Sequence, residues 1–314
     1  MLDTVMTVYR ALAGPDAGVA TLRPLFAPFK TDGVTFDHRT QAGAGGTTTD
    51  FVRITVAGAG GRSRGGEAPT LGVIGRLGGV GARPDRLGLV SDADGAVAAM
   101  AAALEAATMA AQGDRLPGDL IVSTHVCPRA RIVDHKPVPF MESPVSMADK
   151  NAWDVRPEME AILSIDTTKG NRILNRRGIA ITPTAKEGYI LKASADLLDV
   201  YEAVTGELPR VLAITTQDIL PYGHGIDHLN SLMQPATATG APVVGIAVTT
   251  GTAVAGSQSH ASHEVDIDLA SRFALETAFR YGQGRLRFYD PGEYARIIDA
   301  YGSLSHLMGA NARA

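Results

Sequence analysis

The sequence predicts an α/β layered fold with a largely parallel central sheet. One observation is a set of short apolar runs, each typical of a strand that is buried on both faces. These runs cover residues 71–75, 120–123, 161–165, 211–215 and 243–248. The other observation is that patterns with helical spacing lie between or after many of these runs. Such alternation of strands and helices is typical of a sheet that is covered by helices.

The chain is expected to open with an amphipathic helix, because its first apolar residues repeat at helical spacing. Those residues are Leu2, Val5, Met6, Tyr9 and Leu12. Further helices are expected at residues 94–112, 197–204, 229–238 and 269–281. A half-buried strand is expected at residues 52–56, where apolar and polar side chains alternate.

One long segment, residues 128–157, contains five prolines and few regular patterns. Loops of this kind often carry functional residues. We therefore expect a long functional loop rather than a domain boundary, and a single α/β domain over residues 1–314.

Composition excludes several classes of protein. A net charge of -4 argues against a general binder of nucleic acid or of anionic membranes. No apolar stretch is expected to reach the roughly 18 residues of a spanning helix, and the N-terminus lacks the pattern of a secretory signal. The single cysteine, Cys127, excludes an internal disulfide and a cysteine-only zinc site. We expect a soluble cytoplasmic protein.

Polar residues follow the predicted strands at several points along the chain. They are Arg76, Asp92, Asp94, His125, Cys127, Asp166, Thr167, Lys169, Asp218, His260, His263 and Glu264. The carboxyl ends of parallel strands lie at one edge of a sheet, where active groups collect. The pattern therefore predicts one site at that edge.

The acidic residues also have ordinary structural interpretations. Either Asp92 or Asp94 can act as the N-cap of the alanine-rich helix that follows. Asp166 can turn the chain after its strand, and the pair His260 and His263 can be solvated loop residues. These alternatives stay open beside the functional ones.

Each remaining candidate residue also has both a structural and a functional interpretation. Cys127 is commonly a small buried apolar residue, although His125 two positions before it keeps a catalytic or ligand role open. Lys169 and Arg172 are either surface charges or groups that hold a substrate carboxylate beside Asp166.

The order of these motifs resembles the zinc aminopeptidase and carboxypeptidase superfamily, in particular its glutamyl-aminopeptidase-like branch. The resemblance implies a three-layer α/β/α sandwich with a mixed, largely parallel central sheet and one or two zinc ions at the strand ends. As a whole, the sequence looks like a member of a bacterial family designated domain of unknown function 1177, which is grouped with these peptidases.

The resemblance assigns roles to individual residues. Asp92 matches the aspartate that bridges the metal ions and opens an alanine-rich helix. Asp166 looks like the later acidic ligand, and His260 with Glu264 is similar to the late histidine motif. The resemblance therefore implies metal ligands at Asp92, Asp166 and His260.

The sequence also departs from the superfamily pattern. Arg76 and Gly78 stand in place of the first histidine and its aspartate, and His125 and Cys127 stand in place of a glutamate pair. An arginine stays protonated and cannot ligate a metal. Arg76 could instead take over the electrostatic work of a missing cation.

We expect a metal-dependent hydrolase of an amide bond in a small peptide-like or amino-acid-derived substrate. The metal held by Asp92, Asp166 and His260 would activate water. His125 would act as general base and Arg76 would stabilise the oxyanion, with Cys127 beside them. Substrate contacts are expected from Lys169, Arg172, Thr167, Asp94, His263 and Glu264.

Two other functions remain open. Cys127 and His125 could form the nucleophile and base of a metal-free enzyme on the same scaffold. The chain could also be a catalytically degenerate protein that binds a small molecule. The expected partners are a small-molecule or short-peptide substrate and further copies of the chain in a homo-oligomer, with no nucleic acid and no membrane.

Overall fold

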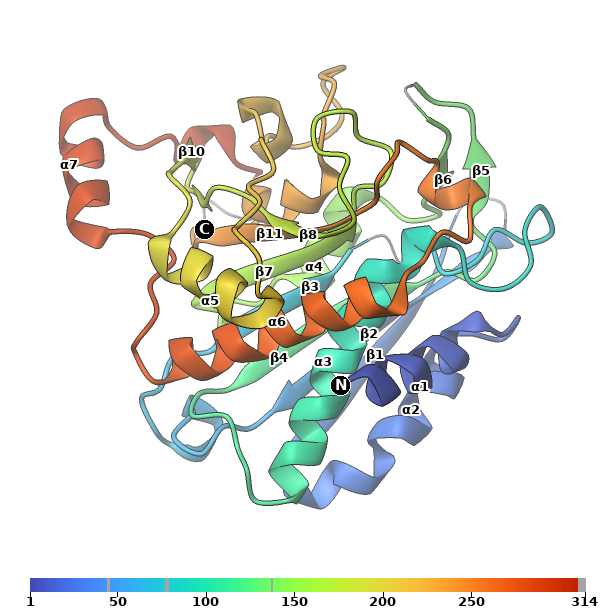
Figure 1. Cartoon of the computed structure of the whole chain (residues 1–314), viewed down its shortest axis with the longest axis horizontal. Helices are drawn as coiled ribbons and strands as arrows, with labels where there is room; N and C mark the ends of the chain where they lie inside the picture. The colour runs from blue at the N-terminus through green and yellow to red at the C-terminus, as the bar shows by residue number, and fades with distance from the viewer. Residues whose placement is uncertain (44–45, 77–78, 137, 310–314) are drawn as a thin grey trace.

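The computed structural model describes residues 1–43, 46–76, 79–136 and 138–309. Within these residues, the main sheet has the strand order β1-β2-β4-β3-β7-β11-β9-β10, and β8 also pairs with β11 (Figure 1). Its strands are β1 (Val34–Ala42), β2 (Thr48–Val56), β3 (Leu71–Gly75), β4 (Leu120–Val126), β7 (Ala161–Thr167), β8 (Gly178–Ile181), β9 (Ala185–Lys186), β10 (Tyr189–Ile190) and β11 (Val243–Thr249).

The middle of the sheet is parallel. β3 pairs in parallel with β4 and β7, and β7 pairs in parallel with β11. β1, β2 and β8 pair antiparallel with their neighbours. Every residue of the four parallel strands is buried, which explains why their sequences are continuous apolar runs. The predicted mixed, largely parallel sheet is confirmed, and the carboxyl ends of its central strands lie at one edge.

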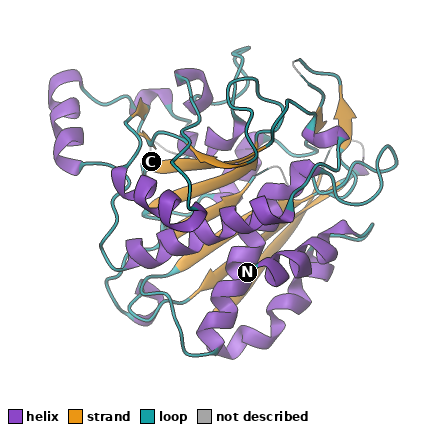
Figure 2. Ribbon diagram, viewed as in Figure 1, coloured by secondary structure: helices purple, strands orange, loops and turns teal. Residues whose placement is uncertain are grey.

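Helices cover both faces of the sheet. One face carries α1 (Leu2–Ala13), α2 (Val19–Phe26), α3 (Asp94–Ala111), α5 (Ala195–Thr205) and α6 (Glu264–Gly282) (Figure 2). The other face carries α4 (Met147–Asp154) and the 3₁₀ segments Thr216–Ile219 and Ser231–Thr237. A large apolar cluster fills the first interface and a smaller one fills the second. The three-layer α/β/α arrangement is therefore present, with α7 (Pro291–Tyr301) at its periphery.

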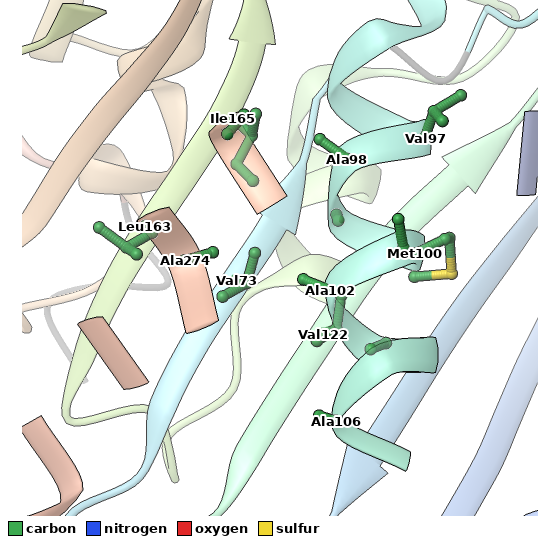
Figure 3. Close-up of a cluster of buried hydrophobic side chains, with 14 of the residues drawn as sticks. Val73, Val97, Ala98, Met100, Ala102, Ala106, Val122, Leu163, Ile165 and Ala274 are labelled. Atoms are coloured by element: carbon green, nitrogen blue, oxygen red, sulfur yellow. The ribbon is translucent and has the colours of Figure 1, made fainter. Parts of the chain in front are cut away.

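Helix α3 is the central helix of the first layer. Figure 3 shows its small side chains Ala98, Ala102 and Ala106 with strand residues of the same buried cluster. A Cβ at Gly95 would lie 2.4 Å from the carbonyl oxygen of Ile165, so only glycine permits this approach. The close packing holds the N-terminus of α3 directly against the ends of β3 and β7.

The apolar composition of α3 corrects one expectation. The segment Ser91–Ala111 has the length and hydropathy of a membrane-spanning helix, contrary to the prediction that no stretch does. However, 83% of the relevant window is buried inside the fold. This segment is the core helix of the layer that covers the sheet.

Other predicted elements differ from the structure. The run at residues 211–215 forms only an isolated bridge, between Val211 and Ile181. The helix expected at residues 229–238 is the 3₁₀ segment Ser231–Thr237, which contains Pro235. A proline within a segment removes a backbone donor and disfavours a regular α-helix.

The expected loop at residues 128–157 contains regular structure. It forms the hairpin of β5 (Arg131–Val133) and β6 (Phe140–Glu142), followed by α4. Ser146 caps α4, because its Oγ accepts a hydrogen bond from the Asp149 N–H at 3.1 Å. Helix α4 lacks an apolar periodicity because its buried residues are polar, namely Lys150, Asn151 and Asp154.

Candidate active site

Four of the residues that the sequence predicts for a site lie at the carboxyl edge of the parallel strands. Arg76 follows β3, His125 lies near the end of β4, and Asp166 lies near the end of β7. Asp92 lies in the 3₁₀ turn Ser91–Ala93 that leads into α3. All four side chains are buried. They form a polar group inside the fold, which we call the edge centre.

Helix α4 contributes two more residues to the edge centre that were not predicted. Lys150 and Asp154 are four residues apart, so both lie on the buried face of this helix. Asp154 Oδ2 lies 3.5 Å from Arg76 Nη1 and 3.7 Å from His125 Nδ1. The sequence carried one signal for this helix, because the spacing of Ser146 and Asp149 is that of a capping box.

Lys150 is a buried cation with an open position beside it. Its side chain is 4% exposed and lines a pocket that Asp92 and His125 also line. In the part of the chain that the structure describes, no carboxylate oxygen lies within ion-pair distance of its ammonium. Burial, followed by repulsion from Arg76, lowers the pKa of Lys150 to about 8. This ammonium can therefore meet a group that enters the pocket.

Two carboxyl groups of the edge centre, those of Asp92 and Asp166, have pKa values that are raised to near neutral pH. Burial, followed by repulsion from Asp94, raises the pKa of Asp92 to about 7. Burial, followed by repulsion from Asp92, raises the pKa of Asp166 to about 8, although Ser231 Oγ donates a hydrogen bond to Asp166 Oδ2 at 3.0 Å. Groups with such values can accept and donate protons near pH 7.

His125 is neutral in this environment. Burial is the main reason why its pKa falls to about 4, while the nearby Asp154 raises it in part. The ring packs against Phe51, with 6.0 Å between ring centroids. A base with this pKa is weak, so Asp92 is better matched than His125 to accept a proton at pH 7.

Cys127 has the properties of a buried apolar residue. It packs in a small cluster with Ala82, Val90, Ala130 and Met141. Burial raises the pKa of its thiol. Since the thiolate is the nucleophilic form, this environment disfavours Cys127 as a nucleophile.

Asp94 and Lys169 form a separate buried ion pair. The ammonium of Lys169 also donates to the Ala261 carbonyl at 2.6 Å, and Ser262 Oγ donates to Asp94 Oδ1 at 2.5 Å. The N-cap position of α3 is Ala93, so Asp94 is the first helical residue rather than the cap. Through these contacts, the chain after β7 is held against the start of α3 and against the segment before α6.

The late histidine motif lies outside the edge centre. The Ser91 N–H donates to the Ser259 carbonyl at 3.0 Å, so the chain at His260 passes close to the turn that holds Asp92. The imidazole of His260 is nevertheless exposed, and its Nδ1 lies 2.8 Å from the Leu89 carbonyl oxygen. Among the described residues, His260 is therefore not grouped with Asp92 and Asp166 as a metal site.

The other predicted contacts are dispersed. Thr167 is buried at the end of β7, Arg172 is exposed, His263 is the residue before α6, and Glu264 is its first residue. Asp218 accepts backbone hydrogen bonds from Leu229 and Asn230 at 2.6 and 2.8 Å, which is a structural role. Among the described residues, no three His, Cys, Asp or Glu side chains are placed to hold a metal ion.

The comparison with protein families gives one match. A family model described as protein of unknown function (DUF1177) matches residues 40–311. The comparison with curated proteins gives no match.

The comparison with solved structures gives leucine aminopeptidases. The K354E mutant of tomato leucine aminopeptidase has a TM-score of 0.55 at 11% identity, over 87% of this chain and 60% of that chain. An M17 aminopeptidase from Trypanosoma brucei has a TM-score of 0.53 at 12% identity, over 87% and 61% of the two chains.

A leucine aminopeptidase from Caenorhabditis elegans has a TM-score of 0.50 at 13% identity, over 88% of this chain and 66% of that chain. The chain thus spans about three fifths to two thirds of the length of these structures. At these identities the likeness shows a peptidase-like α/β fold. The expected glutamyl-aminopeptidase-like branch stays a prediction.

Proposed function

The chain belongs to the family described as protein of unknown function (DUF1177), and on this premise we propose that it hydrolyses an amide bond in a small peptide-like or amino-acid-derived substrate. One observation carries the proposal. Two carboxyl groups that titrate near neutral pH, Asp92 and Asp166, lie with the buried cations Arg76 and Lys150 at the carboxyl edge of a peptidase-like sheet. An acid, a base and a source of positive charge are what amide hydrolysis requires.

The zinc site expected from the sequence does not fit these residues. Asp92 and Asp166 have suitable oxygen atoms, and within the described residues Asp166 Oδ1 is buried without a hydrogen-bond partner. A catalytic zinc ion, however, takes three protein ligands, and among the described residues no three His, Cys, Asp or Glu side chains are placed to hold one. The neighbouring groups are the cations Arg76 and Lys150, which do not ligate metals while protonated. The proposed chemistry therefore uses the side chains of the edge centre alone.

In the proposed reaction, Asp92 is the general base. Its carboxylate takes a proton from a water molecule in the pocket as the water oxygen attacks the carbonyl carbon. The carbonyl oxygen becomes an oxyanion, which the positive charges of Lys150 and Arg76 stabilise. Asp166, protonated below about pH 8, gives its proton to the amine that leaves. The products are a carboxylic acid and an amine.

The pocket limits the size of the substrate. Its interior volume is about 20 Å³, which is room for about one water molecule. The attacking water fits this space, and the substrate carbonyl would have to reach its opening. We therefore propose small substrates, namely amino-acid amides, dipeptides and N-acyl amino acids.

Initial rates on a panel of these three substrate classes test the proposed function. Asp92→Asn should lower kcat by about 10²–10⁴-fold, because an amide cannot act as the general base. Asp268→Asn is the matched control, since Asp268 is a buried aspartate of α6 that pairs with Arg272 at 2.7 Å. Unchanged kcat in Asp92→Asn, or no hydrolysis of any amide by the wild type, would contradict the proposal.

A further inference from the structure

The buried charges of the edge centre come from separate elements of the fold. Arg76 follows β3 and is fully buried, whereas Lys150 comes from α4 on the other face of the sheet. Lys150 lines one pocket with Asp92, and Arg76 lies 3.5 Å from Asp154. Buried carboxyl groups and buried cations therefore meet at the edge centre.

These side chains bring positive charge to the buried carboxyl groups without an added ion. Three buried carboxyl groups, Asp92, Asp154 and Asp166, lie with the two buried basic side chains Arg76 and Lys150, and Asp154 lies 3.5 Å from Arg76. Buried charges persist only when they are compensated in this way. A divalent ion beside Asp92 and Asp166 would instead add positive charge to a centre that already holds two buried cations.

We propose that Lys150, together with Arg76, takes the place of a metal ion at the edge centre, so that the centre functions without one. Lys150 is the more important of the two because it lines the pocket, whereas Arg76 is engaged by Asp154 and by the Met147 sulfur at 2.6 Å. Its role toward a substrate oxyanion rests on the proposed function. Its role as the internal cation beside Asp92 and Asp166 does not depend on that function.

Thermal unfolding of chelator-treated protein, with and without Mg²⁺, Mn²⁺ or Zn²⁺, tests this inference. The wild type should show substoichiometric metal by elemental analysis and no rise in Tm with any of the three ions. Lys150→Met removes the internal cation and keeps the apolar stem. This variant should bind a divalent ion between Asp92 and Asp166, and its Tm should rise by a few degrees with saturating ion.

Two further variants complete the design. Lys150→Gln repeats the test with a neutral side chain that hydrogen-bonds, in case Lys150→Met does not fold. Lys186→Met is the control, because Lys186 donates to the Gly240 carbonyl at 2.7 Å and lies beside Tyr289 and Tyr294 rather than at the edge centre. It should show no response to the ions.

Stoichiometric metal in the wild type, with a lower Tm after its removal, would overturn the inference. So would a folded Lys150 variant that shows no response to any of the ions. If the Lys150 variants respond while the wild type hydrolyses no amide, the proposed function fails and the inference stands.

Discussion

The chemistry of Asp166 depends on its burial. Its carboxyl group would titrate at its ordinary pKa of 3.8 in water and titrates at about 8 in the fold. Because the folded-state pKa is raised, the associated stability is fully present below pH 3.8 and is lost as pH rises through 8. An asparagine at position 166 has nearly the same shape and no ionisable group, so the free energy of unfolding would not fall with pH for this reason.

We therefore predict that Asp166→Asn stabilises the protein at high pH. Relative to the wild type, its free energy of unfolding should be higher at pH 9 than at pH 4 by on the order of a few kcal/mol. Urea unfolding at the two pH values measures the difference. Asp268→Asn controls for the loss of a buried carboxylate outside the edge centre, and a pH-independent difference for Asp166→Asn would contradict the prediction.

Lys150 and Asp154 show why single residues of the site escaped prediction. A lysine and an aspartate at helical spacing are ordinary surface residues in most sequences, and their burial here depends on the packing of α4 against β4. His260 shows the opposite case. The chain at His260 does pass the turn that holds Asp92, but its imidazole is exposed rather than buried in the edge centre.

Among the elements, the N-terminus of α3 controls where Asp92 lies. A Cβ added at Gly95 would meet the carbonyl oxygens of Ile165 at 2.4 Å and of Arg76 at 2.9 Å. These atoms belong to the backbone and cannot move aside independently of the sheet. The helix would have to shift away from the strand ends, and Asp92 would shift with it.

Gly95→Ala should therefore lower stability by about 1–3 kcal/mol, the usual cost of overpacking in a core. Amide hydrolysis should fall as well, because the edge centre loses its geometry. Gly14→Ala is the control, since a Cβ at Gly14 meets no atom within 4 Å. Equal Tm values for the two variants would show that α3 does not need the glycine.

The strand elements could be predicted because they are apolar on both faces, and β3 has the predicted bounds. Helix α4 could not be predicted by the same means, because its buried face is polar. The run at residues 211–215 has the composition of a strand, yet only Val211 pairs with another strand, through a bridge to Ile181. Apolar composition identifies buried segments, whereas pairing depends on the tertiary fold.

At the scale of the whole molecule, the fold is similar to that of leucine aminopeptidases, and buried cations lie at its strand ends. The likeness in fold would suggest the metal chemistry that the sequence resemblance implies. The buried cations of α4 and of the segment after β3 support an acid–base centre instead. A fold does not determine the chemistry of its site, because the arrangement of layers determines only where the site lies.

The expected homo-oligomer stays a prediction at this scale. Size-exclusion chromatography with light scattering would measure the mass of the assembly directly. The edge centre as described consists of residues from one chain, so the proposed reaction does not depend on the result.

The pH–rate profile of amide hydrolysis by metal-depleted wild type tests the central claim most directly. With Asp92 as base and Asp166 as acid, kcat should rise as the pH approaches 7, fall above about 8, and show the same profile before and after chelation. Loss of activity on chelation, with recovery on addition of Zn²⁺ or Mn²⁺, would contradict a centre in which Lys150 and Arg76 supply the positive charge.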